Sequence, residues 1–168
     1  MRIAIRLGVL VALGVPQSAG AQSHIPPLDT LRAYARGLAG CYQFSWPDPI
    51  PALPTSMPGS LELRPVMQRA LGYHRLLYFQ VRPAEVKNGY RLWKPMGPDS
   101  LEIELMASTG VTPQDVLLTG RVARDTLTGQ VVQLDVVPDT TRDFPKFTSS
   151  VRGRFVGVRS KCGRRGAA

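Results

Sequence analysis

Histidine, cysteine and asparagine are scarce in this chain. Its 168 residues include two His and two Cys, and Asn88 is the only asparagine. His24 lies near the N-terminus, and His74 stands in a predicted strand without a second histidine, so a structural zinc or haem site has little material. We therefore expect no metal centre and no cofactor.

Catalytic motifs are also lacking. The sequence contains no Gly-x-Ser-x-Gly elbow, no phosphate-cradling glycine loop and no Gly-x-Gly-x-x-Gly fingerprint. Glu102 and Glu104 share one strand face, and paired carboxylates can perform acid–base catalysis when burial separates their pKa values. Because these two alternate with apolar residues, we expect them to face water. We expect no enzymatic activity, although a reaction class without such a motif stays open.

The only long apolar run lies at the start of the chain. Leu7–Val15 follows two arginines and precedes Pro16 and the small residues up to Ala21. The run is too short for a bilayer span, which needs about 20 residues, and matches a Sec signal peptide. We expect residues 1–21 to be cleaved after Ala21. Residues 22–168 then form one periplasmic or extracellular domain without an integral membrane span.

Basic residues outnumber acidic ones and give a net charge of +9. Most of them are arginine, which we interpret mainly as the bias of a GC-rich bacterial genome. The arginines are spread along the chain without an aromatic-rich RNA-binding signature, so we expect no nucleic-acid partner. The densest basic cluster lies at the C-terminus and is interpreted as a solvated tail or a nonspecific contact with an anionic membrane surface.

The two cysteines are far apart in sequence. In an oxidising compartment, Cys41 and Cys162 most economically form one disulfide. Leu38–Cys41 also reads as a lipobox, in which Cys41 would carry a lipid, but three charged residues precede it where an apolar segment is needed. A redox-active or catalytic thiol is the third interpretation.

Periodicity predicts one helix followed by strands. Apolar residues recur at helical spacing over Pro27–Leu38, and alternation with period two marks the later segments. The predicted strands are Cys41–Trp46, Ser60–Arg64, Tyr73–Val81, Gly89–Lys94, Ser100–Met106, Asp115–Arg124, Gln130–Val137 and Ser149–Val158. Predicted turns lie at Asn88-Gly89, Pro98-Asp99, Thr109-Gly110, Thr128-Gly129 and Pro138-Asp139. The proline-rich segment Trp46–Gly59 is either a rigid connector or a flap over a cavity mouth.

The cysteines favour closure of the sheet. In an eight-stranded up-and-down barrel the first and last strands are antiparallel neighbours. Cys41 opens the first predicted strand and Cys162 follows the last, so a disulfide would staple the closing seam. The predicted fold is therefore an all-β, eight-stranded antiparallel up-and-down barrel with a short N-terminal helix. A β-sandwich is the alternative.

This layout resembles the lipocalin or wider calycin barrel. A short helix leads into Gly40-Cys41-Tyr42, and an arginine-bearing strand ends the chain. In that family a Gly-x-Trp opens the first strand and a late arginine packs over the Trp. The resemblance thus implies that Tyr42 stands at the Trp position and that Arg152, Arg154 or Arg159 is the arginine. The chain is also similar to small secreted bacterial proteins of uncharacterised activity with a Gly-Cys-aromatic start and an Arg-x-x-Cys end.

The apolar strand faces supply the candidate site. The residues expected to point inward are Leu63, Leu77, Phe79, Leu92, Leu101, Ile103, Leu105, Val116, Leu118, Val132, Leu134 and Phe155. They form either a packed core or the wall of a cavity for one small ligand. The candidate ligand-binding residues are Tyr42, Phe79, Leu92, Leu101, Ile103, Leu118, Arg152 and Arg154. An inward Arg152 or Arg154 would suit an amphipathic ligand with an acidic head, such as a fatty acid. We expect noncatalytic binding of a small hydrophobic or amphipathic molecule; the alternative is a structural or protein-interaction module with a filled core.

Overall fold

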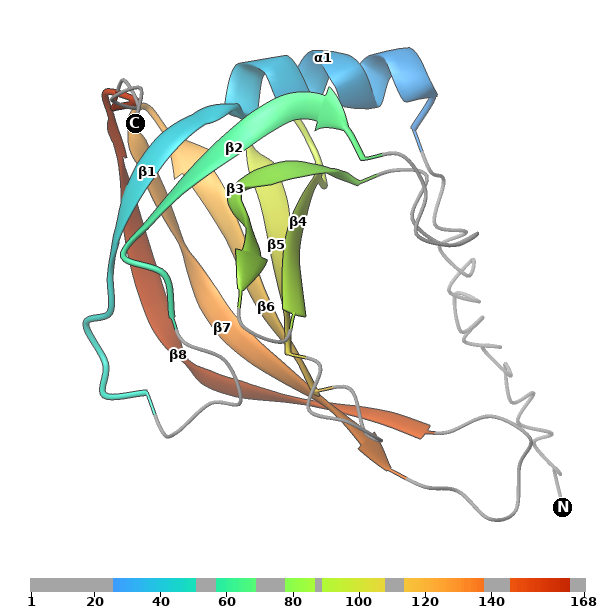
Figure 1. Ribbon diagram of the computed structural model, residues 1–168, viewed down its shortest axis with the longest axis vertical. Helices are drawn as coiled ribbons and strands as arrows, with labels where there is room; N and C mark the ends of the chain where they lie inside the picture. The colour runs from blue at the N-terminus through green and yellow to red at the C-terminus, as the bar shows by residue number, and fades with distance from the viewer. Residues whose placement is uncertain are drawn as a thin grey trace, which may run out of the picture.

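The computed structural model describes residues 26–50, 57–68, 78–86, 89–107, 114–137 and 146–163. These ranges contain one helix and eight strands (Figure 1). Their bounds are α1 (Leu28–Leu38), β1 (Gly40–Ser45), β2 (Ser60–Met67), β3 (Phe79–Val86), β4 (Gly89–Pro95), β5 (Ser100–Ala107), β6 (Gln114–Ala123), β7 (Thr126–Val137) and β8 (Lys146–Ser160). The expected signal peptide, His24, Leu77 and His74 lie outside the described residues.

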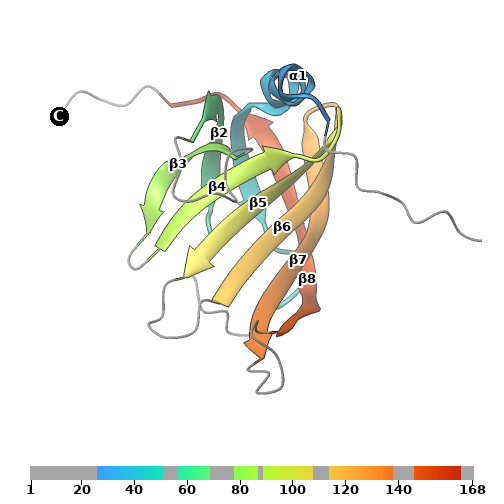
Figure 2. The ribbon, with the colours of Figure 1, turned by 90° about the vertical axis from the view of Figure 1, so that its right-hand side faces the viewer.

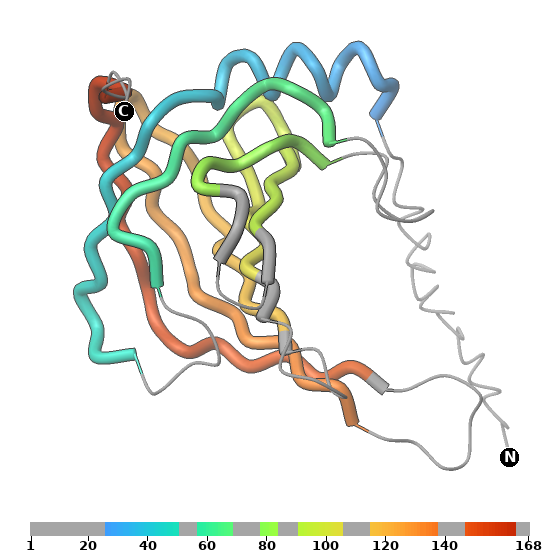
Figure 3. The backbone as a smooth tube through the Cα atoms, in the orientation of Figure 1, coloured from blue at the N-terminus to red at the C-terminus, as the bar shows by residue number. Residues whose placement is uncertain are grey.

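The strands form a closed antiparallel barrel in the order of the sequence. Each strand pairs with its neighbours along the chain, and β1 pairs with β8 in the register Cys41 to Ser160 and Phe44 to Gly157. Figure 3 shows this seam, where the first and last strands run side by side. The predicted barrel is confirmed and the sandwich alternative is wrong.

Helix α1 covers one end of the barrel (Figures 1 and 2). Leu31, Ala35 and Leu38 recur at helical spacing and are buried, so the apolar stripe of the helix faces the barrel. Asp29 in the first turn complements the positive end of the helix dipole. No helix in the described part of the chain is long and apolar enough to cross a membrane.

The predicted disulfide is confirmed. Cys41 and Cys162 are bonded with their Cα atoms 5.2 Å apart, beside the β1–β8 pairing and at the end covered by α1. Neither cysteine is free. The Cys41 thiol is therefore bonded to Cys162 in this structure.

Trp93, the largest side chain in the core, is held by an irregularity of the sheet. The register between β2 and β3 shifts between Leu63 and Met67, so β2 carries extra residues there. Trp93 Nε1 donates a hydrogen bond of 3.0 Å to the carbonyl oxygen of Arg64, within this shifted stretch. The bulge therefore provides the acceptor that a buried indole needs.

One predicted turn is wrong. Thr128-Gly129 lies inside β7, and the β6–β7 turn is formed by Arg124 and Asp125, with Arg124 at φ 55°. Gly129 pairs with Gly120 across the two strands. A Cβ on Gly129 would collide with the backbone of Thr119, so this glycine permits close approach of two strands rather than a reversal of the chain. The predicted turn at Pro98-Asp99 does join β4 to β5.

Leu92 does not point into the barrel. It pairs with Gln80 and Glu104 on the outer face, while Trp93 faces inward. Leu92 is nevertheless buried. It is not part of the core cluster, so it is covered by atoms on the outer side of the sheet. An apolar residue can thus be covered on either face of this sheet.

Val132 and Leu134 are also on the outer face, contrary to the prediction. They alternate with Val131, which is buried and pairs with the buried core residue Leu118, and with Gln133. The apolar run around residue 132 leaves the inward parity ambiguous. In the structure Val131 and the polar Gln133 face inward, and Val132 and Leu134 therefore face outward.

Candidate functional site

The end of the barrel under α1 is closed by a network around Tyr42. The Tyr42 hydroxyl donates a hydrogen bond of 2.9 Å to the carbonyl of Leu38. Arg159 Nη2 donates to the Tyr42 hydroxyl at 2.9 Å and to the Gly37 carbonyl at 3.2 Å, and its guanidinium carbon lies 5.4 Å from the centre of the Tyr42 ring. Of the three arginines that the resemblance offers, Arg159 packs over the aromatic residue. Tyr42, a predicted ligand-binding residue, thus joins helix, first strand and last strand.

The centre of the barrel is filled by side chains. The predicted ligand-binding residues Phe79, Leu101, Ile103 and Leu118 belong to one core cluster and have at most 1% of their surface exposed. The Phe79 ring packs on Trp93 with 5.4 Å between ring centres. The structure therefore brings these residues together in the dry interior.

Polar side chains enter the interior at the end away from α1. In the barrel register Arg91 lies opposite Leu105, Leu105 opposite Val116, and Val116 opposite Gln133. Gln133 is in turn hydrogen-bonded to Arg152. We call these five residues the Arg91 row; it crosses β4 to β8 on the inner face.

Arg152 reaches the row through a bulge in β8. Val131 pairs with Gly153 and Val132 with Val151, which leaves Arg152 as the extra residue. Its Nε donates a hydrogen bond of 3.0 Å to Gln133 Oε1. Gln133 Nε2 donates at 2.7 Å to Asp135 Oδ1. Arg152 thus has the inward orientation that an arginine would need to bind the acidic head of a ligand inside the barrel.

Arg91 is the second cation of the row, and the sequence interpretation missed it. Its side chain is buried with 6% exposure, and Nε has no hydrogen-bond partner. Burial lowers the pKa of its guanidinium. The signal was present, because Arg91 stands two residues before Trp93 and the two therefore share a strand face.

Arg154 faces outward, unlike the candidate role predicted for it. Its side chain is 70% exposed and forms a forked pair with Asp48, with Nε to Oδ2 at 2.9 Å and Nη2 to Oδ1 at 3.0 Å. The backbone N–H of Arg154 also donates to Asp48 Oδ2 at 3.1 Å. The hydrogen bond from Arg154 holds the pKa of the Asp48 carboxyl below its ordinary value. Arg154 thus contributes nothing to the interior.

The start of the proline-rich segment lies against the barrel. Trp46 stacks on Phe44 and tilts against Phe155, with ring centres 5.8 and 6.1 Å apart. Ile50 lies near the Cα of Gly153, where a side chain would meet it. We call residues 46–50 the strap. Asp48 ties the strap to β8 beyond the last β1 pairing.

Glu102 and Glu104 lie on the outer face as predicted, but they are largely covered rather than open to water. Lys94 Nζ lies 2.6 Å from Glu102 Oε1, and Glu104 has 7% exposure. Burial and the negative charge of Glu104 raise the pKa of Tyr78. Burial lowers the pKa of Lys94, but the hydrogen bonds that Lys94 donates to Glu102 and Tyr78, together with their charges, outweigh it, so the pKa is raised. The cluster thus consists of the ion pair of Lys94 with Glu102 and of Tyr78 beside Glu104, on the outer wall of the barrel.

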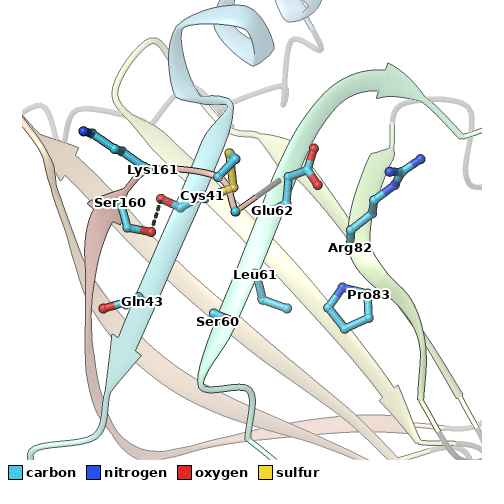
Figure 4. Close-up of a pocket in the computed structure, with 11 residues that line it drawn as sticks. Cys41, Gln43, Ser60, Leu61, Glu62, Arg82, Pro83, Ser160 and Lys161 are labelled. Atoms are coloured by element: carbon cyan, nitrogen blue, oxygen red, sulfur yellow. Dashed lines mark hydrogen bonds between the residues drawn. A yellow bond between two sulfur atoms is a disulfide. The ribbon is translucent and has the colours of Figure 1, made fainter. Parts of the chain in front are cut away.

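A groove of about 380 Å³ lies beside the disulfide on the outer faces of β1, β2 and β3 (Figure 4). Gln43, Ser60, Glu62, Arg82 and Lys161 line it. Glu62 lies opposite Arg82 in the sheet and pairs with Arg64 at 3.5 Å. The polar side chains that line this groove lie on the surface, in contrast to those of the buried Arg91 row.

The Arg91 row is therefore the candidate site. Within the described ranges, no three His, Cys, Asp or Glu side chains gather as metal ligands would. Comparison with family models, curated proteins and solved structures found no match to this chain. The molecule is an eight-stranded antiparallel closed barrel with an N-terminal helix, an architecture consistent with a calycin-like fold.

Proposed function

We propose that this protein binds a small amphipathic molecule without catalysis, at the end of the barrel away from α1. The observation that carries the proposal is the change of the inner face along the barrel. It is apolar at the Trp93 level, and the next level away from α1 carries Arg91 on one side of Leu105 and Val116 and Gln133 with Arg152 on the other. A surface with apolar walls and a few convergent polar groups is typical of small-molecule sites.

The barrel architecture supports this proposal. Barrels of eight strands either fill their interior with side chains or hold one small ligand. Here the filled part includes Phe79, Trp93 and Ile103, so the proposed ligand occupies the opposite end. The lipocalin resemblance of Gly40-Cys41-Tyr42 supports binding only by analogy, since a fold does not determine a function.

The test combines binding with a location. Native mass spectrometry of the purified protein with decanol should show a complex of one decanol per chain. Hydrogen exchange should then slow at amides near Leu105, Val116 and Gln133, and stay unchanged near Tyr42. Absence of a complex with decanol and with decanoate alike would contradict the proposal, and so would protection confined to the groove beside Cys162.

The alternative is a filled barrel that acts through its outer surface. It is favoured by the large apolar side chains on the outer face of β8, where Phe147 is 64% and Val151 61% exposed. Val136 and Val132 lie opposite them on β7. In that case sedimentation velocity should show self-association that Phe147→Ser with Val151→Ser removes, while decanol should not bind.

A further inference from the structure

Arg91 is a buried cation for which the described part of the chain supplies no counter-charge. It has 6% exposure and an unpartnered Nε. Taking an ion out of water without a partner is among the costliest events in folding. The neighbouring inward positions carry Leu105 and Trp93, which shows that an apolar side chain suits this surface. Arg91 therefore calls for an anion from outside the described chain.

A second cation lies on the same row. Among the described residues, the hydrogen bond of Arg152 uses Nε alone, and its acceptor is the neutral amide of Gln133. Asp135 is bonded to the other end of that amide and not to Arg152. Two inward guanidinium groups thus face one carboxylate, which leaves the row with a net positive charge.

We infer that the amphipathic ligand is an aliphatic acid, with its carboxylate against Arg91 and its chain directed away from α1; this rests on the proposed function. A guanidinium binds a carboxylate through two parallel N–H···O bonds in a fixed fork. The next inner level towards α1 is filled by Trp93, Ile103, Leu118 and Val131, which have no exposed surface. The head therefore enters first, and the net charge of +9 favours the approach of an anion.

The experiment compares ligands of one chain length. Decanoate, decanol and methyl decanoate are titrated into the wild type, Arg91→Met and Arg121→Met by calorimetry. Arg121 is exposed near the α1 end of β6, so its variant loses the same charge outside the row. We expect the wild type and R121M to bind decanoate about 10- to 100-fold more tightly than decanol, the range of a charge-assisted hydrogen bond. R91M should keep decanol binding and lose this preference.

Thermal stability separates binding from a structural role. Without ligand, R91M should raise the Tm, because it removes a buried unpaired charge. Arg91→Lys keeps the charge but loses the planar fork and should show an intermediate preference. A lowered Tm for R91M, with the preference for decanoate retained, would make Arg91 structural and overturn the inference. Wild-type binding of decanol without preference for decanoate would overturn it and leave the proposed function standing. If neither compound binds, both fall.

Discussion

The Tyr42 hydroxyl holds the closed end of the barrel through one oxygen atom. It donates to the carbonyl of Leu38 at the end of α1 and accepts from Arg159 on β8. The acceptor side of the hydroxyl thus faces a charged donor, which makes that bond stronger than a neutral one. This oxygen connects three elements that are far apart in sequence.

Tyr42→Phe should therefore lower the free energy of unfolding by about 1–3 kcal/mol, because the Leu38 carbonyl and Arg159 each lose a partner. Urea denaturation measures this. Tyr34→Phe is the matched control, since Tyr34 lies on α1 and is only partly buried, and it should change stability by about 0.5 kcal/mol or less. Equal effects of the two variants would contradict the role assigned to the Tyr42 hydroxyl.

Asp48 and Arg154 give stability a pH dependence. Because Arg154 lowers the pKa of the Asp48 carboxyl in the folded state, its contribution is present above the ordinary Asp pKa of about 3.9. It is lost as pH falls through the lower, folded-state pKa. Asp48→Asn should thus lower the Tm at neutral pH, with the difference from wild type shrinking in acid.

The matched control for this prediction is Asp29→Asn. Asp29 pairs with Arg32 at 3.2 Å, but its side chain is 94% exposed, so little stability depends on the pair. D29N should leave the Tm near that of wild type at every pH. A D48N difference that stays constant down to acid pH would show that the carboxylate charge is not the cause.

At the scale of elements, the close approach of the paired strands β6 and β7 depends on two glycines that have no side chain. Gly129 faces Gly120, and a Cβ on Gly129 would meet the Thr119 carbonyl in backbone that cannot move aside. Gly129→Ala should lower the free energy of unfolding by about 1–3 kcal/mol or more. Gly37→Ala in α1 has open space and should raise it by about 0.5–1 kcal/mol. Urea denaturation of both variants tests whether the space around a glycine determines if its replacement by alanine lowers or raises stability.

Strand positions could be predicted from the sequence where alternation was regular, as in Ser100–Met106. The inward face could not be predicted where apolar residues are adjacent. Leu92 stands next to Trp93 and Val132 next to Val131, so hydrophobicity alone does not select the parity. Cross-strand register selects it, and register is a property of pairs of strands rather than of one segment.

The candidate site was predictable in part for the same reason. Arg152 was anticipated as a possible inward cation, but the β8 bulge that turns it inward leaves no mark in the sequence. Arg91 was missed because a charged residue in a strand is normally expected to face water. Its two-residue spacing from Trp93 is the signal that would have found it.

At the scale of the whole molecule, two cysteines predicted closure correctly. They lie near the ends of the strand series, and the closed sheet brings these ends together through the pairing of β1 with β8. The predicted helix then lies at the same end, since it leads directly into β1. The molecule thus has one end held by α1, the disulfide and Tyr42, and an opposite end where the Arg91 row lies.

Removing the disulfide should separate the stability of the barrel from its proposed binding. The bond joins residues 121 positions apart, and a loop of this size contributes about 4–5 kcal/mol in the chain-entropy model. Cys41→Ser with Cys162→Ser should lower the free energy of unfolding, measured by urea denaturation, by about this amount. The reduced wild type should show the same loss. Because the bond and the Arg91 row lie at opposite ends, decanol affinity should stay unchanged in the folded double variant. A loss of affinity parallel to the loss of stability would place the ligand at the seam and not at the row.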